Sequence, residues 1–140
     1  MELGIKTLKK GKILYHKEHE YGKKFIVILN DTTENLKDIC VFCLTTTTPK
    51  SKRQPPCDNI RGYFYIPICE KDYFERETWL LLDDLQSSYL EDILNDIANG
   101  VIVTKEDSIL SDGTVKDLMK CIGNLLEISI EYYELIFDNN

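Results

Sequence analysis

The stretch "KKFIVILNDTTENLKDICVFCLT" (residues 23–45) holds two apolar runs separated by a polar segment of turn-forming residues. Both runs, residues 25–30 and residues 39–45, are short and rich in β-branched and aromatic side chains, which is typical of strands. Their apolar character is continuous rather than alternating, so we expect both faces of each strand to be buried. The stretch therefore predicts two strands at the centre of the fold.

Further strand-like runs lie on both sides of this centre. They cover residues 11–16, 63–68 and 78–85, and we expect Pro67 to confine part of the second run to a sheet edge or a bulge. The runs follow one another at short spacing, without a helical segment between them. This order favours an antiparallel barrel or sandwich over an alternating α/β fold.

Helical periodicity is confined to the C-terminal half of the chain. Apolar residues at helical spacing over residues 90–97 predict a helix that ends at Gly100. A longer pattern over residues 111–137 predicts an amphipathic helix packed on the strands, with Gly123 as a candidate break. We therefore expect the 140 residues to form a single domain of the α+β class, mainly β with a C-terminal helix.

Charge is distributed unevenly along the sequence. The net charge is -7, but residues 1–62 carry a net +5 and residues 63–140 a net -12. A polyanion should therefore meet the N-terminal half and a basic partner the C-terminal half, unless the asymmetry serves solubility alone. The chain has neither a membrane-spanning apolar run nor the apolar core of a secretory signal, so we expect a cytoplasmic protein.

The five cysteines are an odd number at irregular spacing, which favours reduced thiols over a disulfide framework. Cys40 and Cys43 form a C-x-x-C, but they lie in an expected strand, where positions three apart face opposite sides. We expect core residues there instead of a structural zinc site. The same interpretation covers Cys57, Cys69 and Cys121, and no metal or cofactor is expected.

Four segments and a C-terminal helix follow one another in a characteristic order. The segments are "GKILYH" (residues 11–16), "KKFIVILND" (residues 23–31), "ICVFCLT" (residues 39–45) and "YFERETWLLLDDLQ" (residues 73–86). In this succession, over roughly residues 10–136, the chain resembles the MazF/PemK (CcdB/PemK-like) toxins of bacterial toxin–antitoxin systems. The resemblance implies a small SH3-like barrel, a homodimer, and metal-independent cleavage of single-stranded RNA through the substrate's own 2′-hydroxyl.

The resemblance also implies two catalytic positions. The family keeps an arginine at the head of its second strand and a threonine at the end of its third, and the matching residues here are Lys24 and Thr45. Lys24 would stabilise the charge that develops on the phosphate, and Thr45 would orient the phosphate with its hydroxyl. An antitoxin segment is expected to lie across the same groove.

The remaining candidates are RNA-binding residues near the strand ends. Cations can hold the RNA backbone, and imidazoles can add an auxiliary acid or base. The alternatives are a cationic loop that protects a sheet edge and exposed loop histidines without a role. These candidates are Lys23, Lys50, Lys52, Arg53, His16 and His19.

Two departures from the family pattern leave a second function open. Lys24 replaces the family arginine and loses its bidentate fork, and Asp84 and Gln86 stand where the family has a Q-x-R triplet. The alternative is a catalytically inert protein-binding module of the same fold, a regulatory partner in a defence or stress system.

Overall fold

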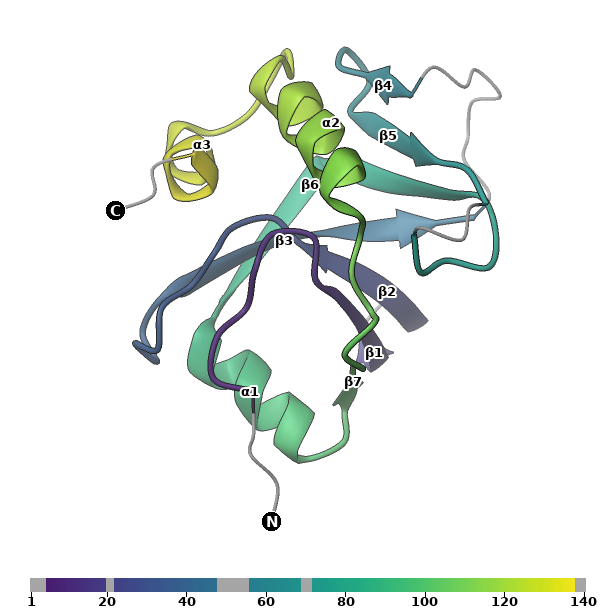
Figure 1. The fold of residues 1–140 in the computed structure, drawn as a ribbon. Coiled ribbons are helices and arrows are strands. Elements are labelled where there is room, and N and C mark those ends of the chain that lie inside the picture. Colours follow the sequence, from purple (N-terminus) through teal and green to yellow (C-terminus); the bar gives the residue numbers. More distant parts are fainter. Residues whose placement is uncertain (1–4, 20–21, 48–55, 69–71, 138–140) are drawn as a thin grey trace.

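Seven strands form one sheet in the part of the chain that the computed structural model describes, and every neighbouring pair is antiparallel (Figure 1). The structure describes residues 5–19, 22–47, 56–68 and 72–137. Within these ranges the strand order is β4-β5-β6-β3-β2-β1-β7, so the sheet is open, with β4 and β7 at its edges. The strands are β1 (Ile13–His19), β2 (Gly22–Ile28), β3 (Ile39–Thr46), β4 (Cys57–Asp58), β5 (Tyr63–Ile66), β6 (Thr78–Tyr89) and β7 (Ile102–Val103).

The two apolar runs of residues 23–45 lie in the middle of the sheet, as predicted. β2 and β3 pair with Val27 opposite Cys43. Residues 26–29 and 40–44 are all buried. The prediction of strands covered on both faces is confirmed.

The first hairpin is tighter than the sequence indicates. β1 continues through polar residues to His19, and β2 already begins at Gly22. Backbone pairing explains the extension, because His16 lies opposite Lys24 and His19 lies opposite Gly22. The expectation that both histidines belong to a loop is therefore wrong, since they lie on a strand.

β6 is also longer than expected, and it contains a bulge. It continues through a polar segment to Tyr89. Phe42 on β3 lies opposite Gln86, whereas Leu44 lies opposite Leu81. Because two steps along β3 correspond to five along β6, the extra residues of β6 bulge out of the ladder.

The sheet edges are short. β5 ends at Ile66, directly before Pro67, and the outer strand beside it is β4. β4 and β7 have two residues each, which is too few to show an alternating pattern in the sequence. The sequence therefore predicts neither of them.

Three helices follow in the described part of the chain: α1 (Leu90–Ala98), α2 (Asp112–Gly123) and α3 (Ile130–Phe137). α1 confirms the first predicted helix, and Gly100 behind it has a positive φ of 78°. The C-terminal helical pattern forms two helices instead of one, and the candidate break at Gly123 is confirmed, because α2 ends there. The molecule is thus of the α+β class, and none of the three helices is long and apolar enough to cross a membrane.

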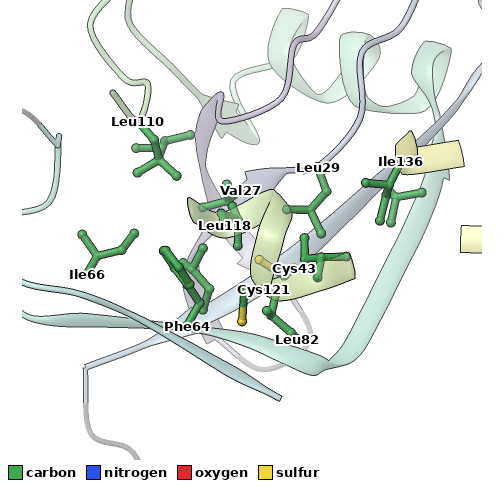
Figure 2. Close-up of a cluster of buried hydrophobic side chains, with 14 of the residues drawn as sticks. Val27, Leu29, Cys43, Phe64, Ile66, Leu82, Leu110, Leu118, Cys121 and Ile136 are labelled. Atoms are coloured by element: carbon green, nitrogen blue, oxygen red, sulfur yellow. The ribbon is translucent and has the colours of Figure 1, made fainter. Parts of the chain in front are cut away.

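Each face of the sheet carries its own hydrophobic core. On one face, α1 covers side chains that include Leu14 and Ile26. On the other, α2 and α3 contribute Leu118 and Ile136, which belong to one cluster with strand residues such as Val27 and Leu29 (Figure 2). We call these two sides the α1 face and the α2 face.

A disulfide joins Cys57 of β4 to Cys121 of α2, with Cα atoms 5.7 Å apart. The expectation of reduced thiols is wrong for this pair, because spacing in the sequence does not show which distant cysteines the fold brings together. Cys40 and Cys43 are free and are buried in the cores of opposite faces, as expected. Cys69 lies outside the described residues.

Candidate functional site

Thr45 lies near the end of β3, and its side chain is buried. Its hydroxyl donates a hydrogen bond to the backbone carbonyl of Phe25 on β2, at 3.0 Å between the oxygens. The backbone pairing of β2 with β3 starts one residue further along β2, where Ile26 lies opposite Leu44. The hydroxyl hydrogen is thus used inside the sheet, and only the oxygen lone pairs are left for a ligand.

Lys24 lies on the opposite face of the sheet from Thr45. Ile26 belongs to the core of the α1 face, whereas Phe25 packs against the core of the α2 face. Successive strand residues alternate, so Lys24 shares the α1 face with Ile26, and Thr45, following Leu44, shares the α2 face with Phe25. The two catalytic positions implied by the resemblance meet at one end of the sheet, but not on one face.

The other predicted residues do not complete this pair within the described part of the chain. His16 lies opposite Lys24, and its Nδ1 accepts a hydrogen bond from the N–H of Glu18 at 3.2 Å. The side chains of Lys23 and His19 lie outside the described residues. The same is true of the whole cationic loop with Lys50, Lys52 and Arg53.

A cavity of about 960 Å³ opens beside Thr45 on the α2 face. Its wall contains an aromatic group in which the Phe25 ring lies 5.5 Å from the Phe74 ring and 5.9 Å from the Tyr73 ring, both edge-on. Three threonines add hydroxyl groups: Thr45, Thr47 and Thr78. The volume and this mixture of apolar and polar groups are typical of a ligand site.

Charged side chains of both signs border the cavity. Arg76 and Lys105 are exposed cations, and Glu75 and Asp107 are exposed carboxylates. Cations and carboxylates in one cavity can hold a phosphate and accept a proton. The cavity therefore offers the groups that acid–base chemistry on a phosphodiester requires.

A third carboxylate on the cavity wall has a structural role. Asp72 is buried and accepts hydrogen bonds from the Ser111 N–H at 2.8 Å and from the Thr114 hydroxyl at 2.9 Å. Ser111 is the N-cap of α2, and Thr114 lies in the first turn of the helix. Asp72 thus ties the segment before β6 to the start of this helix.

A side chain directly before β1 anchors the segment that carries Lys105 and Asp107. The ammonium of Lys12 donates a hydrogen bond to the Lys105 carbonyl at 2.6 Å. Burial lowers the pKa of Lys12 below its ordinary value, although the charges of Asp107 and Glu106 oppose the shift. This contact holds the backbone beneath Lys105 in place.

Sequence reasoning missed Arg76 and Lys105 as site residues. Arg76 stands inside the quoted segment "YFERETWLLLDDLQ", but without a pattern that marks it as a ligand. Lys105 comes from a turn between β7 and α2, sixty residues after Thr45 in the sequence. Only the fold brings the two cations to the cavity beside Thr45.

Comparison of the chain with protein-family models, with curated proteins and with solved structures finds no match. Among the residues that the structure describes, no group of three or more His, Cys, Asp or Glu side chains is arranged to hold a metal ion. The function is therefore inferred from the cavity and from the groups that border it.

Proposed function

We propose that the chain is a divergent MazF/PemK-like endoribonuclease that binds single-stranded RNA in the cavity beside Thr45. The observation that carries the proposal is the combination of an aromatic wall with exposed Arg76 and Lys105 in one cavity. Aromatic rings can stack on unpaired bases, and the cations can hold the phosphate backbone. On this proposal the open sheet is a distant relative of the SH3-like, CcdB/PemK-like barrel.

The proposed reaction uses the substrate's own nucleophile. The ribose 2′-oxygen attacks the adjacent phosphorus, the bond from phosphorus to the 5′-oxygen breaks, and a cyclic phosphate and a 5′-hydroxyl result. Glu75 and Asp107 are the candidates for removing the 2′-proton, which is then returned to the leaving 5′-oxygen. Arg76 and Lys105 would stabilise the negative charge that grows on the phosphorus oxygens.

Arg76 and Lys105, and not Lys24, would stabilise the charge on the phosphate. Lys24 lies on the α1 face, whereas the cavity opens on the α2 face with Thr45. Thr45 remains a wall residue whose lone pairs can accept a hydrogen bond from a ribose hydroxyl, because its own hydrogen is bonded to Phe25.

The test is a gel assay of end-labelled, single-stranded RNA of mixed sequence, incubated with purified protein in EDTA. We expect cleavage, and we expect Arg76→Ala and Lys105→Ala each to slow it about tenfold or more. Lys24→Ala should change the rate by less than about twofold. Lys37→Ala is the matched control, since this lysine is an exposed cation paired with Glu91 on α1.

Intact RNA across varied sequences would contradict the proposal. Cleavage that is lost in Lys24→Ala but kept in Arg76→Ala would instead place the catalytic site at Lys24, the position that the resemblance implies. Thermal unfolding of each variant separates loss of activity from loss of fold.

A second candidate function is a catalytically inert, protein-binding member of the same fold. It is favoured by the separation of Lys24 and Thr45 onto opposite faces and by the commitment of the Thr45 hydroxyl to Phe25. Intact RNA, together with normal growth of cells that express the chain, would support it. Growth arrest that requires Arg76 would exclude it.

We further propose the assembly that accompanies this function: a homodimer, with an antitoxin or another protein as partner, in the cytoplasm. Sedimentation at several concentrations tests the dimer.

The Cys57–Cys121 disulfide provides a test of the proposed cytoplasmic location, because such bonds are uncommon in the cytosol. Thiol alkylation of protein taken directly from cells tests whether the bond is present there.

A further inference from the structure

A second hollow, which we call the acidic groove, lies on the α2 face away from the cavity. It has a volume of about 550 Å³ and runs between the bulge of β6 and the connection from α2 to α3. Leu82, Leu85 and Ile128 give it an apolar lining, and Asp83, Asp84 and Glu127 give it carboxylates. No described residue lines both the acidic groove and the cavity.

The bulge explains why two carboxylates stand at the acidic groove. The extra residues of β6 lie between Leu81 and Gln86 and include Asp83 and Asp84, which are exposed. A bulge changes the direction of side chains that a regular ladder would place on alternating faces. Both aspartates thus line one hollow.

A tight turn beside the bulge fixes the position of Asp83. Gly62 has a positive φ of 84°, and a Cβ at this position would lie 2.8 Å from both the Cβ and the backbone N of Asp83. The Gly62 carbonyl also accepts a hydrogen bond from the Leu82 N–H at 2.7 Å. The acidic groove is therefore built on close backbone contacts.

Exposed apolar side chains lie on the segments that border the same hollow. Leu126, inside the connection between α2 and α3, lines the acidic groove and is 70% exposed, and Ile130, the first residue of α3, is 77% exposed. Ile60 is 74% exposed, and its neighbour Asn59 accepts a hydrogen bond from the Leu126 N–H at 2.9 Å. One exposed apolar side chain thus lines the hollow and two more lie on adjoining segments, a grouping that is typical of an interaction surface.

A hydrogen bond between α3 and β6 holds the α3 side of the acidic groove in place. The hydroxyls of Tyr132 on α3 and Ser87 on β6 are 3.0 Å apart and share a hydrogen bond. No lysine or arginine is among the described residues that line the acidic groove. A partner would thus meet carboxylates and apolar side chains on a surface that is already formed.

We propose that the acidic groove docks a basic amphipathic segment of a partner protein. An apolar ridge of the segment would pack on Leu126, Ile130 and the apolar lining, and its lysines or arginines would pair with Asp83, Asp84 and Glu127. Charge complementarity selects this occupant, because carboxylates repel a nucleic acid and an acidic peptide alike. The exposed apolar residues select an amphipathic segment over a purely basic one.

The probe is a fluorescein-labelled leucine/lysine helical peptide of about four turns, compared with a leucine/glutamate peptide of the same length. Fluorescence anisotropy should show binding of the first and not of the second. Asp83→Asn/Asp84→Asn and Leu126→Ser/Ile130→Ser should each weaken binding about tenfold or more. Amide chemical shifts should change around Asp83 and Ile128 and not around Thr45.

Matched variants elsewhere on the surface serve as controls. Asp92→Asn/Glu106→Gln removes two exposed carboxylates, and Leu36→Ser removes a leucine that is 50% exposed. Each should alter binding by less than about twofold. All substituted residues are exposed, so thermal unfolding should show folded variants.

Equal binding of both peptides would overturn the proposal, as would unchanged binding in both acidic groove variants. A third contrary outcome is a concentration-dependent dimer that Leu126→Ser/Ile130→Ser dissociates, with no peptide bound by the native protein. That result would assign the surface to a second copy of the chain. None of these outcomes depends on whether the protein cleaves RNA.

Discussion

The hydroxyl of Thr45 closes the end of the β2–β3 pair, and its contribution can be measured. Thr45→Val removes the hydrogen bond to the Phe25 carbonyl and keeps the shape of the side chain. We expect the free energy of unfolding to fall by about 1 kcal/mol. Urea denaturation measures the change. Thr45→Ser keeps the hydroxyl but loses the buried methyl group, so it measures the part that packing plays. A valine variant as stable as the native protein would show that this bond contributes nothing.

The buried thiols of Cys40 and Cys43 should be unreactive in the native protein. Burial raises the pKa of each thiol to about 12, so the reactive thiolate is scarce below that pH. In a Cys69→Ser background we expect iodoacetamide to modify neither residue at pH 7–10 within hours. Mass spectrometry after labelling measures this.

Denaturation provides the control for the thiol experiment. In the unfolded chain both thiols return to an ordinary pKa and should be labelled at pH 9. Fast labelling of either residue under native conditions would show that its surroundings open to solvent.

At the scale of an element, Asp72 determines how α2 begins. It accepts hydrogen bonds from the Ser111 N–H and the Thr114 hydroxyl, in a buried position. Asp72→Ala leaves both donors without this partner, and we expect a loss of about 2–3 kcal/mol in unfolding free energy. Urea denaturation measures the loss.

Asp31 offers a matched comparison for Asp72. Its carboxylate also accepts a backbone hydrogen bond, from the Lys10 N–H at 2.9 Å, but it is exposed. Asp31→Ala should therefore cost less than about 1 kcal/mol. Equal effects of the two substitutions would mean that burial of Asp72 adds nothing to its role.

The elements that could be predicted from the sequence are those with a repeating apolar pattern. Continuous apolar runs predicted β2 and β3, and helical spacing predicted α1 and the start of α2. The last four residues of β6, "QSSY", are polar, and they form a strand because β3 pairs with them. Pairing between distant segments leaves no local pattern, and for this reason β4 and β7 were also missed.

The candidate site was predicted only in part, for a related reason. The resemblance, and no pattern in the strands themselves, singled out Thr45 and Lys24. Thr45 lines a cavity, whereas strand alternation puts Lys24 on the opposite face. Arg76 and Lys105 reach the cavity through the fold alone, so no local pattern groups them with Thr45.

At the scale of the whole molecule, β6 connects the two candidate surfaces. Its first residue, Thr78, lines the cavity with the two cations, and its bulge supplies Asp83 and Asp84 to the acidic groove. A ligand with negative charge and a partner with positive charge can thus bind the same face without competing. The charge asymmetry of the sequence is only partly reflected in this division, because Arg76 and Lys105 come from the acidic half.

The Cys57–Cys121 disulfide should account for a substantial share of the stability of this molecule. It closes a loop over a sequence separation of 64, and it joins β4 at the sheet edge to α2. The loop-entropy estimate for this length is about 4 kcal/mol, so we expect reduction by dithiothreitol to lower the unfolding free energy by about that amount. Urea denaturation with and without the reductant measures the difference.

The effect of reduction should begin at the sheet edge. β4 has two residues and pairs with β5 alone, so without the disulfide it is held mainly by this pairing and by the contact from Leu126 to Asn59. Hydrogen exchange at the Leu126 amide should accelerate before exchange in β3 does. Dithiothreitol should have no effect on Cys57→Ala/Cys121→Ala. If the reductant leaves the stability of the native protein unchanged, the bond does not stabilise the fold, and β4 is held by its other contacts.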